Sequence, residues 1–443
     1  MAEYNTKIGT GLINQCYITN HSKSVKLDIE DQVDEIGYYE SIFNPTVSFH
    51  VSITDASDIK NSLPIVGGER VDISITDSFE GSPDIDGGYD DKPLRLYKLA
   101  DREKINDRSE RITLLCTSDH MMKNMYKSVD RSFRNQKASD IISKILETQF
   151  DDELFEFDET LGLHTYTFNR VPPFRAINQI IAEAESASTG SSCYFFFETN
   201  DGYFLRNLDD MLIQEPMTEQ ESGQKLVYRY IYGDIGGDNI SEGSRILDMR
   251  ESVSFDLLNG VMQGQYGVRT NYFDPIRKRL ASSTYLHNEN WESTIHANPN
   301  SLITENISEE FGTEVSLENY MITNYLSLQS DYVSAREPII RNTFRRKQNI
   351  SGRRKSILSR ITNNKIDIMV HGDSRIHAGA TIDIEVPTTG QKAKSGDLID
   401  RFTSGRYLVI AVQHNISDTR YRTVMTVVKD SYVKNPIRGS EEE

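Results

Sequence analysis

The sequence predicts an α+β chain that is rich in β-structure, with two similar β units and an α/β region inserted between them. Three observations indicate this fold. Apolar and polar residues alternate near both ends of the chain, apolar stripes with helical spacing lie between these ends, and one β segment recurs 311 positions further along. The length of 443 residues corresponds to roughly three domains at about 150 residues each.

The first β unit is predicted over residues 1–118. Three runs within it alternate apolar with polar residues, which is the pattern of strands with one buried face. Their apolar members are Val47, Phe49, Val51 and Ile53, then Val71, Ile73 and Ile75, and finally Ile112, Leu114 and Cys116. We expect these residues to form the core face of a sheet.

The inserted α/β region is predicted over residues 119–245 and contains two helices. The first covers residues 138–146, with Ser139 or Asp140 as its N-cap, and the second follows Pro172-Pro173. Their apolar stripes are Ile141, Ile142 and Ile145 in the first helix, and Phe174, Ile177, Ile180 and Ile181 in the second. Such stripes indicate helices that cover a core with one face.

A hairpin is predicted after the second helix, because Asn200-Asp201-Gly202 separates two aromatic segments. The aromatic residues 194–197 are either a ligand platform or strand residues buried beneath the preceding helix, and we favour burial. Residues 234–245 are rich in glycine and polar residues, which is typical of a linker.

The second β unit is predicted to begin at residues 246–275 and to continue over residues 357–433, with an insertion at 276–356. Residues 434–443 form a polar tail. The pattern is weak between about residues 275 and 335. Within this stretch we expect residues 286–312, which carry the only tryptophan, Trp291, to form an irregular surface segment.

The basic segment, residues 341–360, is the sharpest local deviation in charge. It has eight positive residues and no acid, in a chain of formal net charge −18. We expect a helix over residues 336–361 that breaks near Gly352. The candidate interface residues in this segment are Arg341, Arg345, Arg346, Lys347, Arg353, Arg354 and Lys355. Three functions stay open: a helix that binds phosphate, a face that docks on an acidic partner or neighbouring subunit, and a solvated face.

Alternation returns near the C-terminus. The apolar members are Ile366, Ile368 and Val370, then Ile382, Ile384 and Val386, then residues 407–412, and then Met425 and Val427. These runs predict the remaining strands of the second β unit.

An internal repeat relates the two β units. Residues 68–75 resemble residues 379–386, and residues 105–107 resemble residues 416–418, both 311 positions apart. Between them, Tyr97 is matched to Tyr407, with one residue inserted in the second copy. Two similar sheets in one chain can present similar edges to a ring.

Composition and motifs exclude several classes of protein. No run of about 18 apolar residues is present, so we expect no membrane span, and residues 1–10 have no apolar segment typical of a secretory signal. The distant cysteines Cys16, Cys116 and Cys193 fit neither a disulfide framework nor a zinc site. The negative net charge argues against general binding of nucleic acid.

No catalytic or cofactor-binding motif is found, so we predict no catalytic residues, cofactor or metal site. His371 and His377 lie six positions apart in a loop-like segment, which fits metal binding poorly. A glycine-rich stretch carries the acids Asp84, Asp86, Asp90 and Asp91. Clustered acids can hold calcium, but a solvated hairpin tip fits their spacing better. A carboxylate pair for glycoside hydrolysis stays possible, because the chain has 67 acids.

The C-terminal segments 405–409, 412–416 and 421–423 resemble the closing hairpin of baseplate hub proteins from contractile tails. Residues 363–387 resemble the strand–loop–strand that precedes this hairpin in the same family. The family includes phage late-control tail proteins and the hub part of type VI secretion spike proteins, and the chain looks most like the central hub of large contractile-tailed bacteriophages.

This resemblance implies that the two β units are tube-like β-barrels and that the protein is structural, with no reaction catalysed. It implies a homotrimer whose pseudo-sixfold ring adapts the sixfold tail tube to the threefold central spike. The implied partners are the tail tube protein, the central spike protein and baseplate wedge proteins, with DNA only in transit. The implied location is the virion tail baseplate, after synthesis in the host cytoplasm. The alternatives are a tail-associated cell-wall or glycan hydrolase and a glycan-binding module around Trp291.

Overall fold

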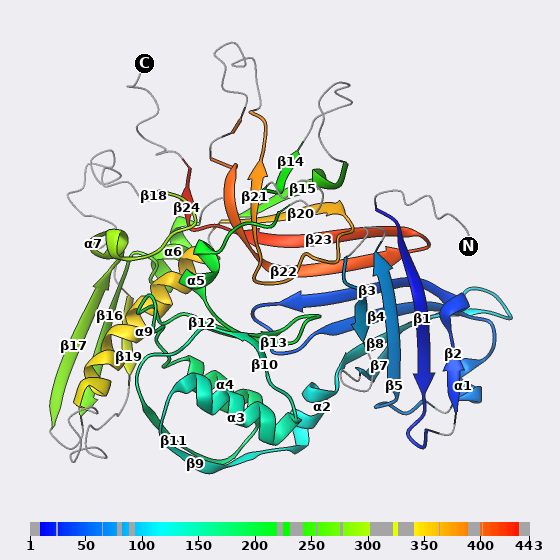
Figure 1. Ribbon diagram of the computed structural model, residues 1–443, viewed down its shortest axis with the longest axis horizontal. Coiled ribbons are helices and arrows are strands. Elements are labelled where there is room, and N and C mark those ends of the chain that lie inside the picture. Colours follow the sequence, from blue (N-terminus) through cyan, green and yellow to red (C-terminus); the bar gives the residue numbers. More distant parts are fainter. Residues whose placement is uncertain are drawn as a thin grey trace.

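The structure is a computed structural model, and it confirms an α+β fold rich in β-structure, with two similar barrels and an inserted α/β region (Figure 1). The described residues are 9–23, 25–63, 65–77, 82–87, 94–218, 225–230, 242–253, 256–274, 278–301, 322–326, 341–362, 364–388, 399–400 and 402–433. Within these ranges, no helix has both the length and the apolar character needed to cross a membrane.

The first barrel is drawn in blue in Figure 1. Its elements are β1 (Gly11–Thr19), β2 (Lys26–Asp28), β3 (Val33–Ser41), β4 (Ser48–Asp55), α1 (Ile59–Ser62), β5 (Arg70–Asp77), β6 (Ile85–Gly87), β7 (Leu94–Lys104) and β8 (Glu110–Ser118). Its main strands are hydrogen-bonded in the order β1–β5–β7–β8–β4–β3. Every apolar residue that the alternation placed on the core face, from Val47 to Cys116, is buried.

The second barrel is a closed ring of six strands. These are β14 (Val227–Tyr230), β15 (Arg245–Val253), β20 (Lys365–His371), β21 (Thr381–Glu385), β22 (Gly405–Ser417) and β23 (Arg420–Val428). The ring runs β22–β21–β14–β15–β20–β23 and returns to β22 through the β22–β23 hairpin. The alternating residues predicted here, including Ile366, Ile382 and Met425, are buried.

Five strands of one barrel repeat five strands of the other. The order β3–β4–β8–β7–β5 is matched by β15–β20–β23–β22–β21. Two register shifts recur at equivalent places: one between Leu96 and Lys98 of β7 matches one between Val409 and Ala411 of β22. The other separates residues 33 and 35 in β3 and residues 246 and 248 in β15. A duplication of β-bulges is stronger support for a repeat than sequence similarity, because each bulge fixes the local twist.

The structure corrects one part of the sequence match. Leu94 lies opposite Val71, and Tyr407 lies opposite Ile382, so Leu94 and not Tyr97 is equivalent to Tyr407. Tyr97 is 50% exposed, whereas Tyr407 is fully buried. The shared tyrosine misled the alignment, since side-chain alternation and not residue identity sets the register of a strand.

The inserted region lies below the barrels in Figure 1. Its elements are α2 (Asp119–Tyr126), β9 (Val129–Gln136), α3 (Ala138–Phe150), β10 (Leu154–Phe157), β11 (His164–Val171), α4 (Pro173–Ile181), β12 (Tyr194–Glu198), β13 (Tyr203–Asn207) and α5 (Leu208–Ile213). The strands form a three-stranded sheet, β10–β13–β12, and the pair β11–β9.

Helices α3 and α4 bury their predicted stripes in a core that they share with the aromatic β12–β13 hairpin. The hairpin turn is closed by the Thr199 amide, which donates to the Gly202 carbonyl at 2.9 Å. The residue at the N-cap of α3 is Lys137 and not Ser139 or Asp140, and the Ser139 amide is satisfied by Thr160 Oγ1 at 3.0 Å. A side chain from a distant segment therefore replaces the local cap that the sequence predicted.

A further unit lies beside the second barrel. Its elements are α6 (Leu257–Gln263), β16 (Gly267–Asp274), β17 (Arg279–Leu286), α7 (His287–Asn290), β18 (Asn300–Ser301), β19 (Ile322–Leu326) and α9 (Arg341–Ile361), and β18 pairs with β24 (Ser431–Tyr432). In the stretch from 275 to 335, where the sequence pattern is weak, β17 and β19 form a sheet with β16. Residues 302–321 and 327–335 lie outside the described residues.

Helix α9 continues through Gly352, so the predicted break is wrong. Gly352 is the point where α9 lies closest to β17: a Cβ atom there would lie 3.3 Å from the Tyr285 Cβ. The glycine therefore permits close packing of the helix on the sheet, and does not interrupt the helix.

Candidate assembly site at the junction of the barrels

Strand β22 belongs to both barrels. Its first part pairs with β21, and its second part, from Ala411 to Ser417, pairs antiparallel with β3 of the first barrel. The turn after β22 also reaches β1, because the Gly11 amide donates to the Thr419 carbonyl at 3.2 Å. The β22–β23 hairpin thus lies between β3 and β1, and its residues Ile416 and Tyr421 are part of the core of the first barrel.

His414 is buried at the centre of this contact. Its Nε2 lies 3.0 Å from the Ile376 carbonyl and its Nδ1 lies 2.8 Å from the Tyr421 hydroxyl. This arrangement suits the neutral tautomer with the proton on Nε2, which donates to the carbonyl while Nδ1 accepts from the hydroxyl. Burial lowers the pKa of His414 to about 4. His414 is therefore a packed strand residue of the junction.

Glu40 on β3 joins three parts of the chain. Its buried carboxylate accepts hydrogen bonds from the Tyr38 hydroxyl (2.5 Å), the Asn200 amide of the inserted region (2.9 Å) and the Ala378 amide of the second barrel (2.9 Å). Burial raises the pKa of Glu40, while these donors act in the opposite direction. Three directed bonds on one carboxylate fix the relative orientation of the parts that supply them.

Two more buried carboxylates act in the same way. Glu198 at the end of β12 accepts from the Val47 amide at 3.0 Å and from the Ser118 hydroxyl at 3.2 Å, which ties the inserted region to the first barrel. Asp77 at the end of β5 accepts from the Ser374 amide of the second barrel at 2.9 Å. The barrels and the inserted region are therefore held together by backbone donors on one part and carboxylates on another.

Part of the basic segment contacts the chain's own inserted region. Arg353 Nη1 donates to the Gly190 carbonyl at 3.0 Å, and its Nη2 lies 3.7 Å from Asp209 Oδ2. Arg354 Nη1 donates to the Ser192 carbonyl at 3.0 Å.

Other members of the segment differ in position. Lys355 is half-buried on α9, and Arg360 is buried with its Nη1 3.9 Å from Asp430 Oδ2. The side chains of Arg341, Arg345, Arg346 and Lys347 lie outside the described residues, although their backbone belongs to α9. An interface role for the segment stays a prediction.

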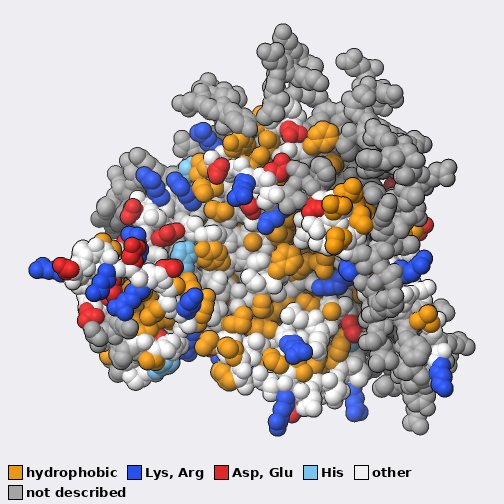
Figure 2. Space-filling view, turned by 180° about the vertical axis from the view of Figure 1, so that it is seen from behind, with side chains coloured by type: hydrophobic (Ala, Val, Ile, Leu, Met, Phe, Trp, Pro, Cys, Tyr) orange, Lys and Arg blue, Asp and Glu red, His pale blue; other side chains and the backbone are white. Residues whose placement is uncertain are grey.

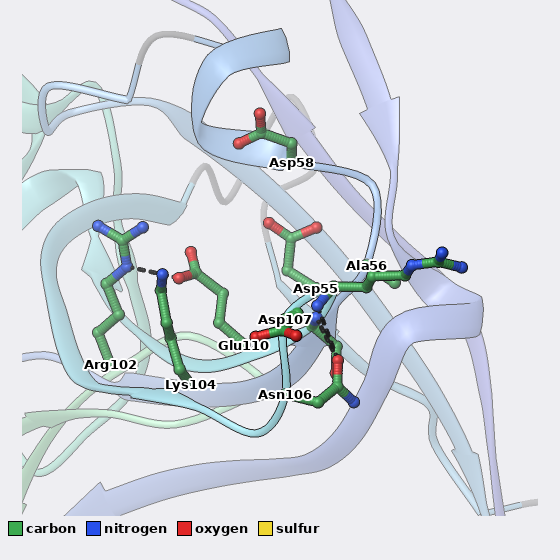
Figure 3. A pocket seen from close by; sticks show the side chains of 10 residues that line it. Asp55, Ala56, Asp58, Arg102, Lys104, Asn106, Asp107 and Glu110 are labelled. Atoms are coloured by element: carbon green, nitrogen blue, oxygen red, sulfur yellow. Dashed lines mark hydrogen bonds and ion pairs between the residues drawn. The ribbon is translucent and has the colours of Figure 1, made fainter.

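A surface hollow of about 350 Å³ lies at the tip of the β7–β8 hairpin (Figure 3). It is lined by residues 55, 56 and 58, at and just after the end of β4, and by residues 102, 104 and 106–110 of the hairpin. Arg102 Nε donates to Glu110 Oε2 at 2.9 Å across the hairpin. The lining mixes both signs of charge, which is typical of a polar contact surface.

The other sequence candidates are structural in the described part of the chain. Asp86 accepts from the Ser74 hydroxyl at 2.7 Å, the Asp84 carbonyl accepts from Asn200 at 2.9 Å, and Asp90 and Asp91 lie outside the described residues. His377 stacks on Phe204 with ring centroids 6.0 Å apart. The described residues include no group of three or more histidines, cysteines or acids that could hold a metal ion.

Trp291 packs on its own domain. Its ring stacks on His296 with centroids 3.4 Å apart, and His287 meets it edge-on at 5.4 Å. His296 Nδ1 in turn lies 2.7 Å from Asp430 Oδ2. One face of the indole is therefore already occupied within the chain.

Sequence reasoning missed Glu40, Glu198 and Asp77. Their partners lie far away in the chain. The available signal was an acid at a position where the alternation predicts an apolar residue: Asp77 follows Val71, Ile73 and Ile75 at the same spacing of two.

The comparisons with known proteins agree with the sequence resemblance. No known protein-family profile matches the chain. The chain is 20% identical over 432 residues to a protein of Vibrio phage KVP40 named "Probable baseplate hub protein gp334", and the match covers 93% of each chain.

Solved structures with the same fold include a tail protein from Neisseria meningitidis MC58 and the 43 kDa tail protein of prophage MuSo2 from Shewanella oneidensis. Both have a TM-score of 0.51, with 8% and 10% identity, and cover 94% of this chain and 96% and 98% of theirs. The predicted resemblance to hub and tail proteins is confirmed by these similarities in sequence and fold.

Proposed function

We propose, from the similarity to a phage baseplate hub protein over nearly the whole chain, that this protein is a structural subunit of a contractile phage tail baseplate. The observation that carries the proposal is the duplicated barrel, because it occurs together with whole-length similarity in sequence and fold to tail proteins. The role is that of a scaffold and not of an enzyme.

The proposed assembly is a homotrimer. Two similar barrels in each of three chains supply six similar units, so the ring is threefold in sequence and near-sixfold in shape. Such a ring adapts a sixfold tail tube on one side to a threefold central spike on the other. The buried carboxylates at the junction support this role, because they hold the two barrels of a chain at one fixed angle.

The proposed partners are the tail tube protein, the central spike protein and baseplate wedge proteins, with the virion tail as the location. DNA passes through the central channel of the ring. The net charge of −18 supports transit without retention, because like charges repel phosphate groups.

Electron microscopy of the purified chain, with native mass spectrometry, tests the proposal. We expect rings with a central hole, a near-sixfold outline and a mass of about three times the 50.5 kDa chain. Addition of the tube and spike subunits of the same virion should give complexes with the ring between them. A chain that stays monomeric alone and with both partners would overturn the proposal.

A further inference from the structure

The contact between β22 and β3 is a contact between two copies of the same structural unit. The hairpin of one barrel adds to the edge of the other barrel, within one chain. The first barrel has an equivalent hairpin, β7–β8, and the second barrel has an equivalent edge strand, β15. The chain therefore contains both halves of a second contact of the same kind.

Within the described part of the chain, most of the outer edge of β7 and most of the outer edge of β15 have no strand partner. Beyond Leu96, β7 pairs only with β8, so the outer edge of residues 98–104 has no strand partner there. Beyond Ile246, β15 pairs only with β20 among the described residues. Unpaired edges of this length are sites where a further strand can add.

We propose that β7 of one chain pairs antiparallel with β15 of a second copy, in the register that β22 uses on β3. This inference rests on the proposed ring, and it names the surface through which the copies meet. The occupant is a second copy of this chain, because the chain itself already shows how the two equivalent surfaces fit.

The register of the proposed contact follows from the strand pairings that are equivalent in the two barrels. Glu103 lies opposite Arg111 on β8, as Asn415 lies opposite Arg422 on β23. In the second barrel, Arg250 of β15 lies opposite Asp367 of β20. In the first barrel, Gly37 of β3 lies opposite His50 of β4 at the equivalent position, so Arg250 is equivalent to Gly37. Because Asn415 pairs with Gly37, the equivalent pair between copies is Glu103 with Arg250.

The neighbouring position is a bulge and adds no matched charge pair. His414 pairs with Tyr38, and their equivalents are the bulge of Asp101 and Arg102 and the acid Glu251. Arg102 already donates to Glu110 at 2.9 Å within its own hairpin, so the charge match rests on Glu103 with Arg250. Opposite charges directly across a ladder stabilise one register and disfavour a slip by one residue.

The charged groups are accessible. Glu103 and Arg250 are exposed, and neither has an ion-pair partner in the part of the chain that the structure describes. Arg102 and Lys104 extend from the same strand toward the hollow of Figure 3. Side chains of both charges also gather on the side of the first barrel in Figure 2. Charged edges stay soluble until a matched partner covers them.

The contact joins unlike surfaces, β7 of one copy and β15 of the next, so it is heterologous. Each chain can then offer one surface of each kind to its two neighbours, which closes a ring when the rotation allows it. In such a ring the hairpin of every barrel pairs with an edge of the next barrel.

Charge exchange at the pair tests the inference. E103R and R250E each place like charges across the ladder, and the double variant E103R/R250E restores an opposite pair. We expect each single variant to raise the concentration for half-assembly about tenfold, and the double variant to return to within about threefold of the unaltered chain. Analytical ultracentrifugation measures the assembly, and thermal unfolding checks that each variant is folded.

Exposed charges on the inserted region supply matched controls. Glu147 on α3 and Arg175 on α4 are exposed and lie on another part of the molecule, so E147R and R175E should leave assembly unchanged. An assembly that E103R and R250E do not weaken overturns this interface and leaves the proposed ring intact. A chain that does not assemble at any concentration overturns both.

A cysteine pair tests the register independently. Residues directly opposite in an antiparallel ladder have Cα atoms about 4.5–5.5 Å apart, within reach of a disulfide. A mixture of E103C and R250C chains should therefore form a covalent dimer on oxidation. The three native cysteines are buried, so their background reaction is expected to be slow. Assembly without cross-linking would show that the register is wrong.

Discussion

His414 and Glu40 are buried polar side chains at the contact between the barrels. Apart from the Tyr38 hydroxyl on the same strand as Glu40, the hydrogen-bond partners named above lie on other strands or loops, so their energies depend on the tertiary structure. Buried groups of this kind cost free energy when a partner is lost, and they titrate far from their usual pH.

The burial of neutral His414 predicts a loss of stability in acid. Its pKa is about 4 in the folded chain and about 6.5 in the unfolded chain, so below pH 6.5 the unfolded state binds the proton and is favoured. Between pH 6.5 and pH 5, we expect His414 to remove about 1.5 kcal/mol from the free energy of unfolding. Urea denaturation of the chain and of H414Q at both pH values measures this contribution by difference.

Exposed His21 supplies the control for this measurement. H21Q makes the same substitution at a side chain that is 56% exposed and lies outside the junction, so it is the reference with which H414Q is compared. An identical pH dependence in H414Q and the unaltered chain would contradict the assignment to His414.

Loss of the Glu40 carboxylate should destabilise the junction strongly. E40A leaves two backbone amides and one hydroxyl buried without their acceptor, which should cost about 3 kcal/mol or more. Glu35 lies on the same strand, is 41% exposed and pairs with His50 at 3.8 Å, so E35A should cost less than about 1 kcal/mol. Equal losses in denaturant unfolding would refute the special role of Glu40.

At the scale of elements, each copy of the β unit has a glycine with nearly the same positive φ just before the equivalent strand. Gly68 and Gly379 precede β5 and β21 with φ of +86° and +88°. The Gly68 amide donates to the Leu96 carbonyl at 2.6 Å, and the Gly379 amide donates to the Val409 carbonyl at 2.8 Å. The two copies therefore share a backbone conformation as well as a strand order.

Alanine at either glycine should destabilise the chain by about 1 kcal/mol or more, because a side chain disfavours positive φ. G379A should cost more than G68A. The new Cβ would lie 3.0 Å from the buried Phe197 ring in one case, and 3.0 Å from the ring of half-exposed His21 in the other. Thermal unfolding of both variants gives the order, and a larger loss in G68A would show that the local packing is misjudged.

At the scale of the whole molecule, the first barrel depends on the second. Ile416 and Tyr421 of the β22–β23 hairpin complete a core whose other buried members lie between residues 16 and 116. The two barrels are thus expected to unfold together and not as independent domains.

I416A should reveal this dependence. We expect a loss of about 2–4 kcal/mol, since the isoleucine is buried and its removal leaves a cavity. Cys16 and Cys116 lie in the affected core and Cys193 lies in another core. If the barrels unfold together, the reaction of all three with a thiol reagent should accelerate alike. Acceleration confined to Cys16 and Cys116 would show that the first barrel opens by itself.

Much of the secondary structure could be predicted from local patterns. The runs around Val51, Leu114 and Ile368 alternate with period two, because one face of each strand is buried. The stripe of α4 has helical period for the same reason. The break predicted at Gly352 was wrong, since α9 continues where it packs on β17. The strands β17 and β19 lie where the local pattern is weak, because their pairing with β16 and not their own alternation defines them.

The candidate site could not be predicted in the same way. Glu40 finds its partners at positions 200 and 378, and β3 pairs with a strand that begins at residue 405. No local pattern encodes contacts over such distances along the chain. The basic segment was visible from charge alone, but the own-chain partners of Arg353 and Arg354 were not.

By itself, the sequence determined the β-rich class, the order of most elements, the internal repeat and the resemblance to hub proteins, because these follow from local periodicity and local similarity. Only the tertiary structure decided that β22 bridges the barrels, that three carboxylates fix the junction, and that the outer edges of β7 and β15 lack a strand partner over most of their length among the described residues. The physical reason is that strand pairing and burial of charge are contacts between distant residues, whose free energy depends on geometry that no single segment contains.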